Sequence, residues 1–162
     1  MYIGLIADTH DRLQRVRKAA EILRAEGVET VLHAGDVTEA KILRALENFD
    51  LWVVWGNMDR NSHLGTIAVS LFGVGHMDTV HYLTLEGKQF ALLHGDDTNL
   101  LRKLIHSGDY DYIIHGHTHK RRDDRIHGTR VINPGALGTT GWRPGTFAIL
   151  DPVRGDLKYL EV

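Results

Sequence analysis

Five short polar motifs carry side chains that could bind a divalent metal ion: DTH at 8–10, GD at 35–36, GN at 56–57, HG at 94–95 and GHTH at 116–119. The ligand-bearing residues in these motifs are Asp8, His10, Asp36, Asn57, His94, His117 and His119. Carboxylates, imidazoles and an amide suit Mn²⁺, Fe²⁺, Co²⁺, Ni²⁺ or Zn²⁺, whereas Ca²⁺ prefers oxygen ligands alone. Seven ligands are too many for one tetrahedral ion but suffice for two ions that share a carboxylate. Two ions ~3.5–4 Å apart are a recurring arrangement for hydrolysing phosphate esters.

Each motif has a simpler interpretation when it is taken alone. Asp8 and Asp36 could each cap a following helix. Asn57 could be a turn residue, and His94 could be a core histidine with a satisfied hydrogen bond. Because the chain holds 11 histidines, roughly one His-x-His pair is expected by chance. The metal-site prediction therefore depends on all five motifs occurring together, each directly after a short apolar run.

These apolar runs predict the elements that would position the motifs. YIGLIA, TVLHA, LWVVW, FALL and YIIH are rich in β-branched, aliphatic and aromatic residues and predict buried strands. Apolar residues at helical spacing predict helices over 12–26, 39–47 and 98–106. The β-α-β-α-β order at the start of the chain favours three parallel strands in an α/β sheet. Ligands bind at the carboxyl ends of such strands, so we expect the five motifs on one rim.

The rest of the chain predicts mostly strands. Residues 79–94 predict a hairpin that turns at Glu86–Gly87, and TRVINPG, TFAILDP and LKYLEV predict further strands. This mixture indicates two stacked sheets with helices outside.

The segment KRRDDR, residues 120–125, is expected to be a solvated loop or, alternatively, to steer phosphate to the site. The loops 60–66 and 139–144 are expected to carry substrate recognition. Trp142 is expected to pack, or alternatively to stack a nucleobase.

Length and composition narrow the class of protein. The 162 residues favour one domain over 1–162, and 43% hydrophobic with 25% charged residues is ordinary for a globular protein. A formal charge of −2 does not indicate nucleic-acid or anionic-membrane binding. With no cysteine, disulfides and thiolate metal sites are excluded. The absence of a signal peptide or of a ~20-residue apolar run favours a cytoplasmic protein without a membrane partner.

The five motifs, in this order, resemble those of the calcineurin-like metallophosphoesterases. The resemblance runs from Tyr2 to about Pro152, and the short length, GHTH and NPGA at 133–136 resemble the small prokaryotic phosphodiesterase branch. It implies an α/β fold built as a four-layer α/β/β/α sandwich with two mixed sheets.

The same resemblance implies a dinuclear metal site. One metal would take Asp8, His10, Asp36 and His119, and the other would take Asp36, Asn57, His94 and His117. Asp36 would bridge the ions, and a hydroxide between them would attack the phosphorus of a small phosphate diester. Manganese is the favoured metal, with Fe, Ni, Zn or Co as alternatives. Asp36, Asn57 and His10 are the residues expected to act in catalysis.

Two positions depart from the resembled family. Many relatives have a histidine after the Gly-Asn of the third motif, where it protonates the leaving group, but this chain has Met58. A thioether is no acid, so we expect weak activity on basic leaving groups unless His10 or a substrate-bound water substitutes. Asp59 would pair with that histidine in such relatives, so in this chain we expect it to have a structural role. Asp96 stands where the branch often has a second histidine after His94, and its carboxylate favours diesters over more anionic monoesters.

Other functions and assemblies are left open by the sequence. A eukaryotic retromer subunit with this fold serves as a protein-binding scaffold with an eroded metal site, and Met58 could be early erosion. The complete ligand set favours an enzyme instead. A phosphomonoesterase or nucleotide phosphatase would also keep both metals. Relatives are often dimers or larger, so a homo-oligomer is a further alternative. His115 is interpreted as a strand residue near the site and not as a ligand.

Overall fold

The structure, a computed structural model, describes residues 1–59, 63–138 and 142–162. Its helices and strands in chain order are β1 (Ile3–Ile6), α1 (Leu13–Ala25), β2 (Thr30–His33), α2 (Ala40–Ala45), β3 (Asp50–Val54), α3 (His63–Phe72), β4 (Met77–Asp78), β5 (Val80–Leu85), β6 (Lys88–Leu93), α4 (Thr98–Ser107), β7 (Tyr112–Ile114), β8 (Arg121–Ile126), β9 (Thr129–Pro134), β10 (Thr146–Asp151) and β11 (Asp156–Glu161). None of the helices in these ranges is long and apolar enough to cross a membrane.

The strands form two mixed sheets. The six-stranded sheet has the order β11-β10-β1-β2-β3-β4, in which β1 to β4 are parallel and β10 and β11 are antiparallel to their neighbours. The five-stranded sheet has the order β5-β6-β7-β9-β8, with parallel β6, β7 and β9 between antiparallel edge strands. The predicted parallel arrangement of the first three strands is confirmed.

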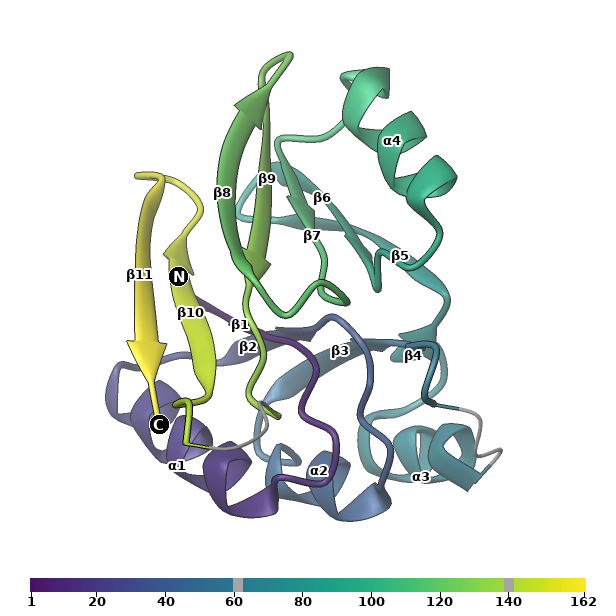
Figure 1. Ribbon diagram of the computed structural model, residues 1–162, viewed down its shortest axis with the longest axis vertical. Coiled ribbons are helices and arrows are strands. Elements are labelled where there is room, and N and C mark those ends of the chain that lie inside the picture. The colour runs from purple at the N-terminus through teal and green to yellow at the C-terminus, as the bar shows by residue number, and fades with distance from the viewer. Residues whose placement is uncertain (60–62, 139–141) are drawn as a thin grey trace.

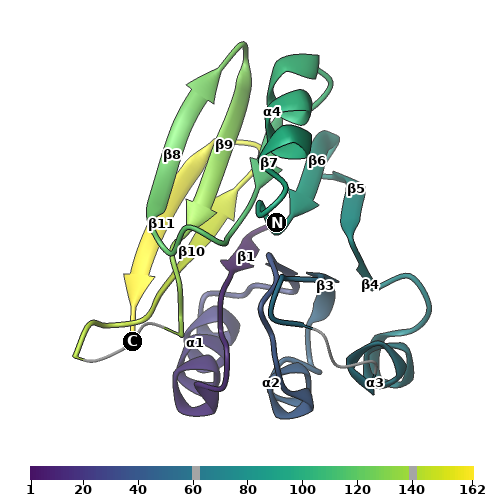
Figure 2. The ribbon, with the colours of Figure 1, turned by 45° about the vertical axis from the view of Figure 1, so that its right-hand side comes forward.

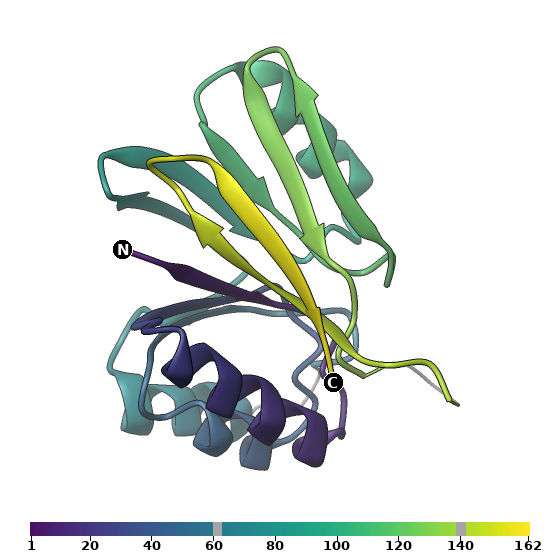
Figure 3. The same ribbon diagram turned by 90° about the vertical axis from the view of Figure 1, so that its left-hand side faces the viewer.

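Three apolar cores separate four layers, as Figures 1, 2 and 3 show from different sides. Helices α1, α2 and α3 lie in a row over the outer face of the six-stranded sheet and enclose the largest core. A second core fills the space between the sheets, and a third lies between the five-stranded sheet and α4. The predicted four-layer sandwich is confirmed.

Strand β1 shows how the sequence produces this layering. Ile3 and Leu5 point into the core between the sheets, while Ile6 faces α1, because successive strand residues point to opposite faces. Gly4 shares the helix-facing side, where an added Cβ would lie 3.0 Å from Leu23 Cδ2 of α1. The missing side chain therefore lets α1 pack closely on the centre of the sheet.

The helix and hairpin predictions agree with the structure apart from their ends. Helices predicted over 12–26, 39–47 and 98–106 correspond to α1, the shorter α2 and α4. Strands β5 and β6 form the predicted hairpin, with Leu85 opposite Lys88 and a two-residue turn between them. Both turn residues have a positive φ, 51° at Glu86 and 72° at Gly87, as a type I′ turn requires.

The predicted loop at 120–125 is wrong, because most of it is strand β8. This strand pairs antiparallel with β9 and forms one edge of its sheet. Its charges pair locally, with Arg122 Nε 2.7 Å from Asp124 and Arg130 Nε of β9 2.7 Å from Asp123. A charged edge strand resists pairing with another chain, so the mixed charges are compatible with a strand.

The loops expected to carry recognition differ in part from the prediction. Residues 60–62 and 139–141 lie outside the described residues, but α3 begins at His63 and takes up the rest of the first loop. Leu64 and Ala68, four residues apart, are buried against the helix-side core, a helical spacing that the prediction overlooked. Trp142 is fully exposed, so the expectation that it packs is wrong.

Candidate metal centre

The five motifs lie just beyond the carboxyl ends of five strands, on one rim of the sandwich. The predicted ligands follow their strands in the order Asp8 and His10 (β1), Asp36 (β2), Asn57 (β3), His94 (β6), and His117 and His119 (β7). The two sheets are joined at this rim, because the amide of His117 donates a hydrogen bond to Asp8 Oδ2 at 3.0 Å. The structure thus brings together residues that are 109 positions apart in the chain.

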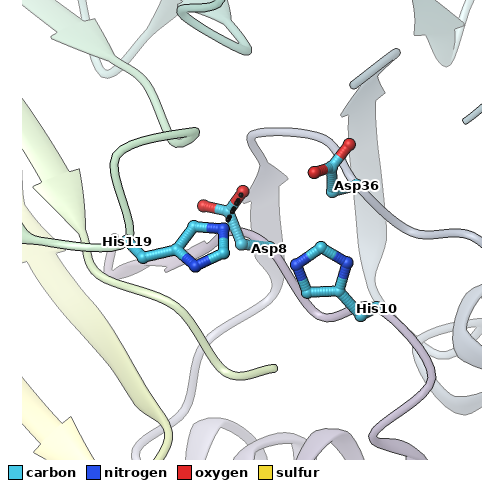
Figure 4. Close-up of side chains that lie close together, drawn as sticks. All are labelled: Asp8, His10, Asp36 and His119. Carbon is cyan, nitrogen blue, oxygen red and sulfur yellow. Dashed lines mark ion pairs between the residues drawn. The ribbon is translucent and has the colours of Figure 1, made fainter. Parts of the chain in front are cut away.

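Four side chains form a first ligand group. Asp8, His10, Asp36 and His119 each offer one ligand atom, and these atoms lie within 4.8 Å of one another. His119 Nε2 is 3.4 Å from Asp8 Oδ1, and Figure 4 shows the four side chains converging. The rings of His10 and His119 meet edge to face, with their centroids 5.4 Å apart. This spacing allows one ion to contact all four atoms after small side-chain shifts.

Asp36 also belongs to a second group, with Asn57, His94 and His117. His94 Nε2 lies 2.9 Å from Asn57 Oδ1 and 3.7 Å from Asp36 Oδ1. His117 Nδ1 lies 3.1 Å from the same Asn57 oxygen. Asp36 is therefore the side chain common to both groups, the arrangement that a shared carboxylate requires.

The hydrogen bonds of His94 indicate that a cation fits this second group. His94 Nδ1 lies 2.8 Å from the carbonyl oxygen of Ala34, so this nitrogen donates its proton there. In the neutral ring the lone pair is then on Nε2, which faces the oxygens of Asn57 and Asp36. A cation placed here would be attracted by the Nε2 lone pair and by the oxygens of Asn57 and Asp36 together. The backbone contact also orients the ring, as hydrogen bonds commonly do for metal-binding histidines.

The charges of the first group indicate the same requirement. Asp8 is completely buried and Asp36 nearly so. Burial and the neighbouring charge of Asp36 raise the pKa of Asp8 to about 8, and the hydrogen bond from the His117 amide offsets this only in part. Burial and His10 lower the pKa of His119, which favours the neutral form that binds metals. A divalent cation would stabilise the ionised carboxylates and the neutral imidazoles together.

The backbone holds several of these residues in an unfavourable conformation. The φ angle is positive at Asp8 (50°), His10 (47°), Asp36 (57°), His117 (67°) and His119 (57°). Residues other than glycine adopt this region at a cost of about 1–3 kcal/mol each, and such residues cluster at functional sites. Their common conformation indicates loops that are shaped to aim these side chains.

Two glycines make room for the carboxylates. A Cβ on Gly56 would lie 2.1 Å from Asp36 Oδ1, and a Cβ on Gly116 would lie 2.8 Å from Asp8 Oδ2. Real Cβ atoms do not approach oxygens so closely, so any other residue would displace a predicted ligand. The glycine in the third and fifth motifs is thus explained by close approach of the backbone to the site.

Asp59 and Met58 both form hydrogen bonds at the site, in different ways. Asp59 accepts hydrogen bonds from the amide of Thr38 at 2.7 Å and from the amide of Gly56 at 2.9 Å. It therefore ties together the loops that carry Asp36 and the third motif. Met58 donates its amide hydrogen to Asp36 Oδ1 at 2.9 Å, while its side chain is 57% exposed on the rim. No acid stands at the position where many relatives place a histidine.

Sequence reasoning missed two supporting residues. His33 Nδ1 accepts the amide hydrogen of Gly35 at 3.2 Å, and its Nε2 lies 3.0 Å from Thr9 Oγ1. Asn133 Nδ2 donates to the carbonyl of Gly116 at 2.7 Å and fixes the fifth motif. The available signals were a histidine inside the apolar run TVLHA and an asparagine that directly follows Val131 and Ile132 in β9.

His115 lies near the site, as expected, but outside its strand. Strand β7 ends at Ile114, and His115 is 2% exposed beneath the fifth motif. Its Nδ1 is 3.1 Å from the carbonyl oxygen of Gly116, and its Nε2 has no hydrogen-bond partner among the described residues. Burial lowers the pKa of His115 to about 4, which keeps the ring neutral.

Comparisons with known proteins agree with this geometry. The family model of the calcineurin-like phosphoesterase superfamily domain matches residues 1–155. A phosphodiesterase of Methanocaldococcus jannaschii is 35% identical over an alignment that covers 98% of this chain and 97% of that protein. The resemblance seen in the motifs is thereby confirmed.

Two solved structures extend the comparison to the fold. The structure of an archaeal phosphodiesterase matches with a TM-score of 0.92 and 31% identity, over 100% of both chains. Vps29 of Entamoeba histolytica, solved in complex with Zn²⁺, matches with a TM-score of 0.66 and 20% identity, over 100% of this chain and 98% of that chain. The second likeness concerns the fold alone. With its motifs, sandwich and full-length relatives in agreement, this chain belongs to the calcineurin-like phosphoesterase superfamily.

Proposed function

We propose that this chain is a phosphodiesterase that works with two divalent metal ions held by a single domain over residues 1–162. The observation that carries the proposal is the place of Asp36 in both ligand groups. The first ion would be held by Asp8, His10, Asp36 and His119, and the second by Asp36, Asn57, His94 and His117. All of these side chains already face their group, so binding would need little rearrangement.

The two ions would supply a water of lowered pKa and positive charge beside the phosphate oxygens. In the hydrolysis, phosphorus forms a bond to an oxygen from water, and its bond to one ester oxygen breaks. The alcohol that leaves takes up a proton. The chain contributes by fixing geometry: buried Asp8, Asp36 and His94 form the floor, and exposed Asn57 and His117 lie at the opening. Since the site is preorganised, little reorganisation is required during the reaction.

The site has no evident side chain at position 58 to protonate the leaving alcohol. Met58 cannot donate a proton, so this role falls to His10 or to a water bound with the substrate. An alcohol of low pKa leaves without such help. The proposal therefore favours diesters with a good leaving group over those with a basic alkoxide.

Several finer points belong to the proposal as predictions. Mn²⁺ is the ion to test first, and Fe, Ni, Zn and Co match the same ligands. A cytoplasmic location and assembly into a homo-oligomer stay predictions from the sequence and from the resemblance.

The proposal is tested by hydrolysis of an activated aryl phosphodiester with and without Mn²⁺, after removal of metal by EDTA. Activity should require the metal and should fall more than about 100-fold in Asp36→Ala, since even partners outside the metal's own ligands contribute 10–100-fold. Asp124→Asn, on the edge strand β8 and outside both ligand groups, is a matched control that should keep activity. Metal-independent turnover, or full activity in Asp36→Ala, would contradict the proposal.

Two other functions have distinct outcomes in the same preparation. A protein-binding scaffold of this fold should take up less than one Mn²⁺ per chain, whereas the proposal expects two by elemental analysis. A phosphomonoesterase should hydrolyse the aryl monoester at least as fast as the diester. The diester is expected to be faster, because Asp96 adds a negative charge near the rim and Met58 offers no acid.

A further inference from the structure

A small cavity adjoins the second ligand group on the side of α4. Its volume is about 210 Å³, and the lining side chains that matter are Trp55, Leu93, His94, Asp96, Asp97 and Leu100. His94 belongs to both places, since its ring lines the cavity while its Nε2 lies 2.9 Å from Asn57 Oδ1. A group in the cavity would therefore lie directly beside a phosphate bound at the metal centre.

The cavity is built to repel anions. The Asp97 carboxylate caps α4 by accepting hydrogen bonds from the amides of Asn99 at 3.0 Å and Leu100 at 2.9 Å, so these amides are not free for an anionic ligand. The exposed Asp96 carboxylate has no hydrogen bond or ion pair within 1–59, 63–138 and 142–162. In the same ranges, no lysine or arginine lines the cavity. Its net charge is negative, with one carboxylate available.

Apart from Thr79, the other side chains of the lining are apolar and include one aromatic ring. Trp55 is half-buried and held in place against α3, where a Cβ on Gly65 would lie 3.4 Å from the indole ring. Leu93 and Leu100 supply aliphatic surface. A cation near a tryptophan face is attracted by the ring, and this attraction would add to that of Asp96.

Size limits the occupant further. A water occupies about 30 Å³ of liquid, so the cavity holds roughly seven waters or one small organic group. A short aminoalkyl or aminoaryl group fits, whereas a group with a second phosphate is disfavoured by its charge.

We propose that this cavity, the Trp55–Asp96 pocket, binds the ester substituent that stays on phosphorus, and that it selects small substituents with a cationic amine over anionic ones. The inference rests on the proposed phosphodiesterase function and adds to it a class of substrate. Asp96 would pair with the amine, and Trp55 would cover the carbon chain that links the amine to the ester oxygen.

The test uses three p-nitrophenyl phosphodiesters that share one leaving group. Their second alcohols are 2-aminoethanol, ethanol and 3-hydroxypropanoate, which are cationic, neutral and anionic. In the Mn²⁺-loaded protein, kcat/KM should fall in that order, by roughly threefold at each step, as exposed charge pairs commonly contribute. Asp96→Asn should reduce the ratio of amine to carboxylate substrate from about tenfold to about twofold. Glu21→Gln, on the outer face of α1, should leave the ratio unchanged.

Binding of the products gives a readout without turnover. Calorimetry should show that O-phosphoethanolamine binds the Mn²⁺-loaded protein more tightly than the phosphate ester of 3-hydroxypropanoate. The preference should shrink in Asp96→Asn and at high salt, where an exposed charge pair is screened. The salt series in the unaltered chain decides the question even if a variant misfolds.

Failure of the inference and failure of the proposed function give different results. Equal kcat/KM for the three diesters, together with equal product binding, would overturn the pocket assignment while leaving the phosphodiesterase intact. An absence of turnover on all three would contradict the phosphodiesterase, and the calorimetric preference would still decide the pocket.

Discussion

Replacing Asp59 by alanine tests whether the metal centre depends on a carboxylate that binds no metal itself. Asp59 is 7% exposed and accepts two backbone hydrogen bonds, from Thr38 at 2.7 Å and from Gly56 at 2.9 Å. A hydrogen bond to a charged group contributes about 1.5–3 kcal/mol, so the loss of both removes about 3 kcal/mol at the lower end of this range. Because the amides belong to the loops of Asp36 and Asn57, part of the loss should appear as weaker metal binding.

The assay has two arms. Urea unfolding in EDTA should show the free energy of unfolding of Asp59→Ala reduced by about 3 kcal/mol. Calorimetric titration with Mn²⁺ should show affinity reduced by about 10–100-fold, as for other residues that support metal ligands. Asp59→Asn keeps one acceptor oxygen, so its free energy of unfolding should fall by about half as much as that of Asp59→Ala. Glu21→Ala, at an exposed position of α1, should change stability by less than about 0.5 kcal/mol.

The reasoning would be refuted by an Asp59→Ala protein with unaltered stability and with Mn²⁺ affinity within twofold of the parent chain. Such a result would mean that the loops keep their shape without the two hydrogen bonds. A loss of stability with unchanged metal affinity would separate the two effects and restrict Asp59 to folding.

Three further predictions address the leaving group, the backbone and the pH dependence. Met58→His restores an acid at the rim, so it should increase the hydrolysis rate of diesters with basic alkyl leaving groups by about 10–100-fold. The rate on activated aryl diesters should change much less, and rate assays with both kinds of substrate measure the difference. Gly56→Ala should abolish tight Mn²⁺ binding in calorimetry, since its Cβ would lie 2.1 Å from Asp36 Oδ1, whereas Gly65→Ala, whose Cβ would meet only a ring at 3.4 Å, should bind normally. Burial lowers the pKa of His33 from 6.5 to about 4, so its contribution to stability is present above pH 6.5 and is lost as the pH falls towards 4. Urea unfolding should therefore show a stability loss of about 1.4 kcal/mol per pH unit in this range that His33→Gln removes, and equal pH profiles for both proteins would contradict it.

The convergence of the predicted ligands could be expected from the sequence because each follows a short apolar run. Parallel strands in one sheet place their carboxyl ends together, so Asp8, Asp36 and Asn57 had to lie near one another once the β-α-β order was recognised. His94 and His117 were expected on the same rim because they too follow apolar runs, whereas their assignment to one of two metals came from the family resemblance. No spacing in the sequence indicates which edge of the second sheet meets the first.

The parts that were not predicted depend on tertiary contacts. Strand β8 carries mixed charges because it lies at a sheet edge, and nothing in RRDDRI itself shows the neighbour that pairs with it. The contacts of Asp59, His33 and Asn133 link loops that are distant in the chain. The Trp55–Asp96 pocket combines the end of β3 with the start of α4, which only the folded chain brings together.

The central claim is that Asp36 joins two metal ions, and anomalous diffraction from crystals grown with Mn²⁺ tests it most directly. The account predicts two manganese peaks on the rim, about 3.5–4 Å apart, with the Asp36 carboxylate in contact with both. A single peak, or two peaks of which one does not touch Asp36, would contradict it.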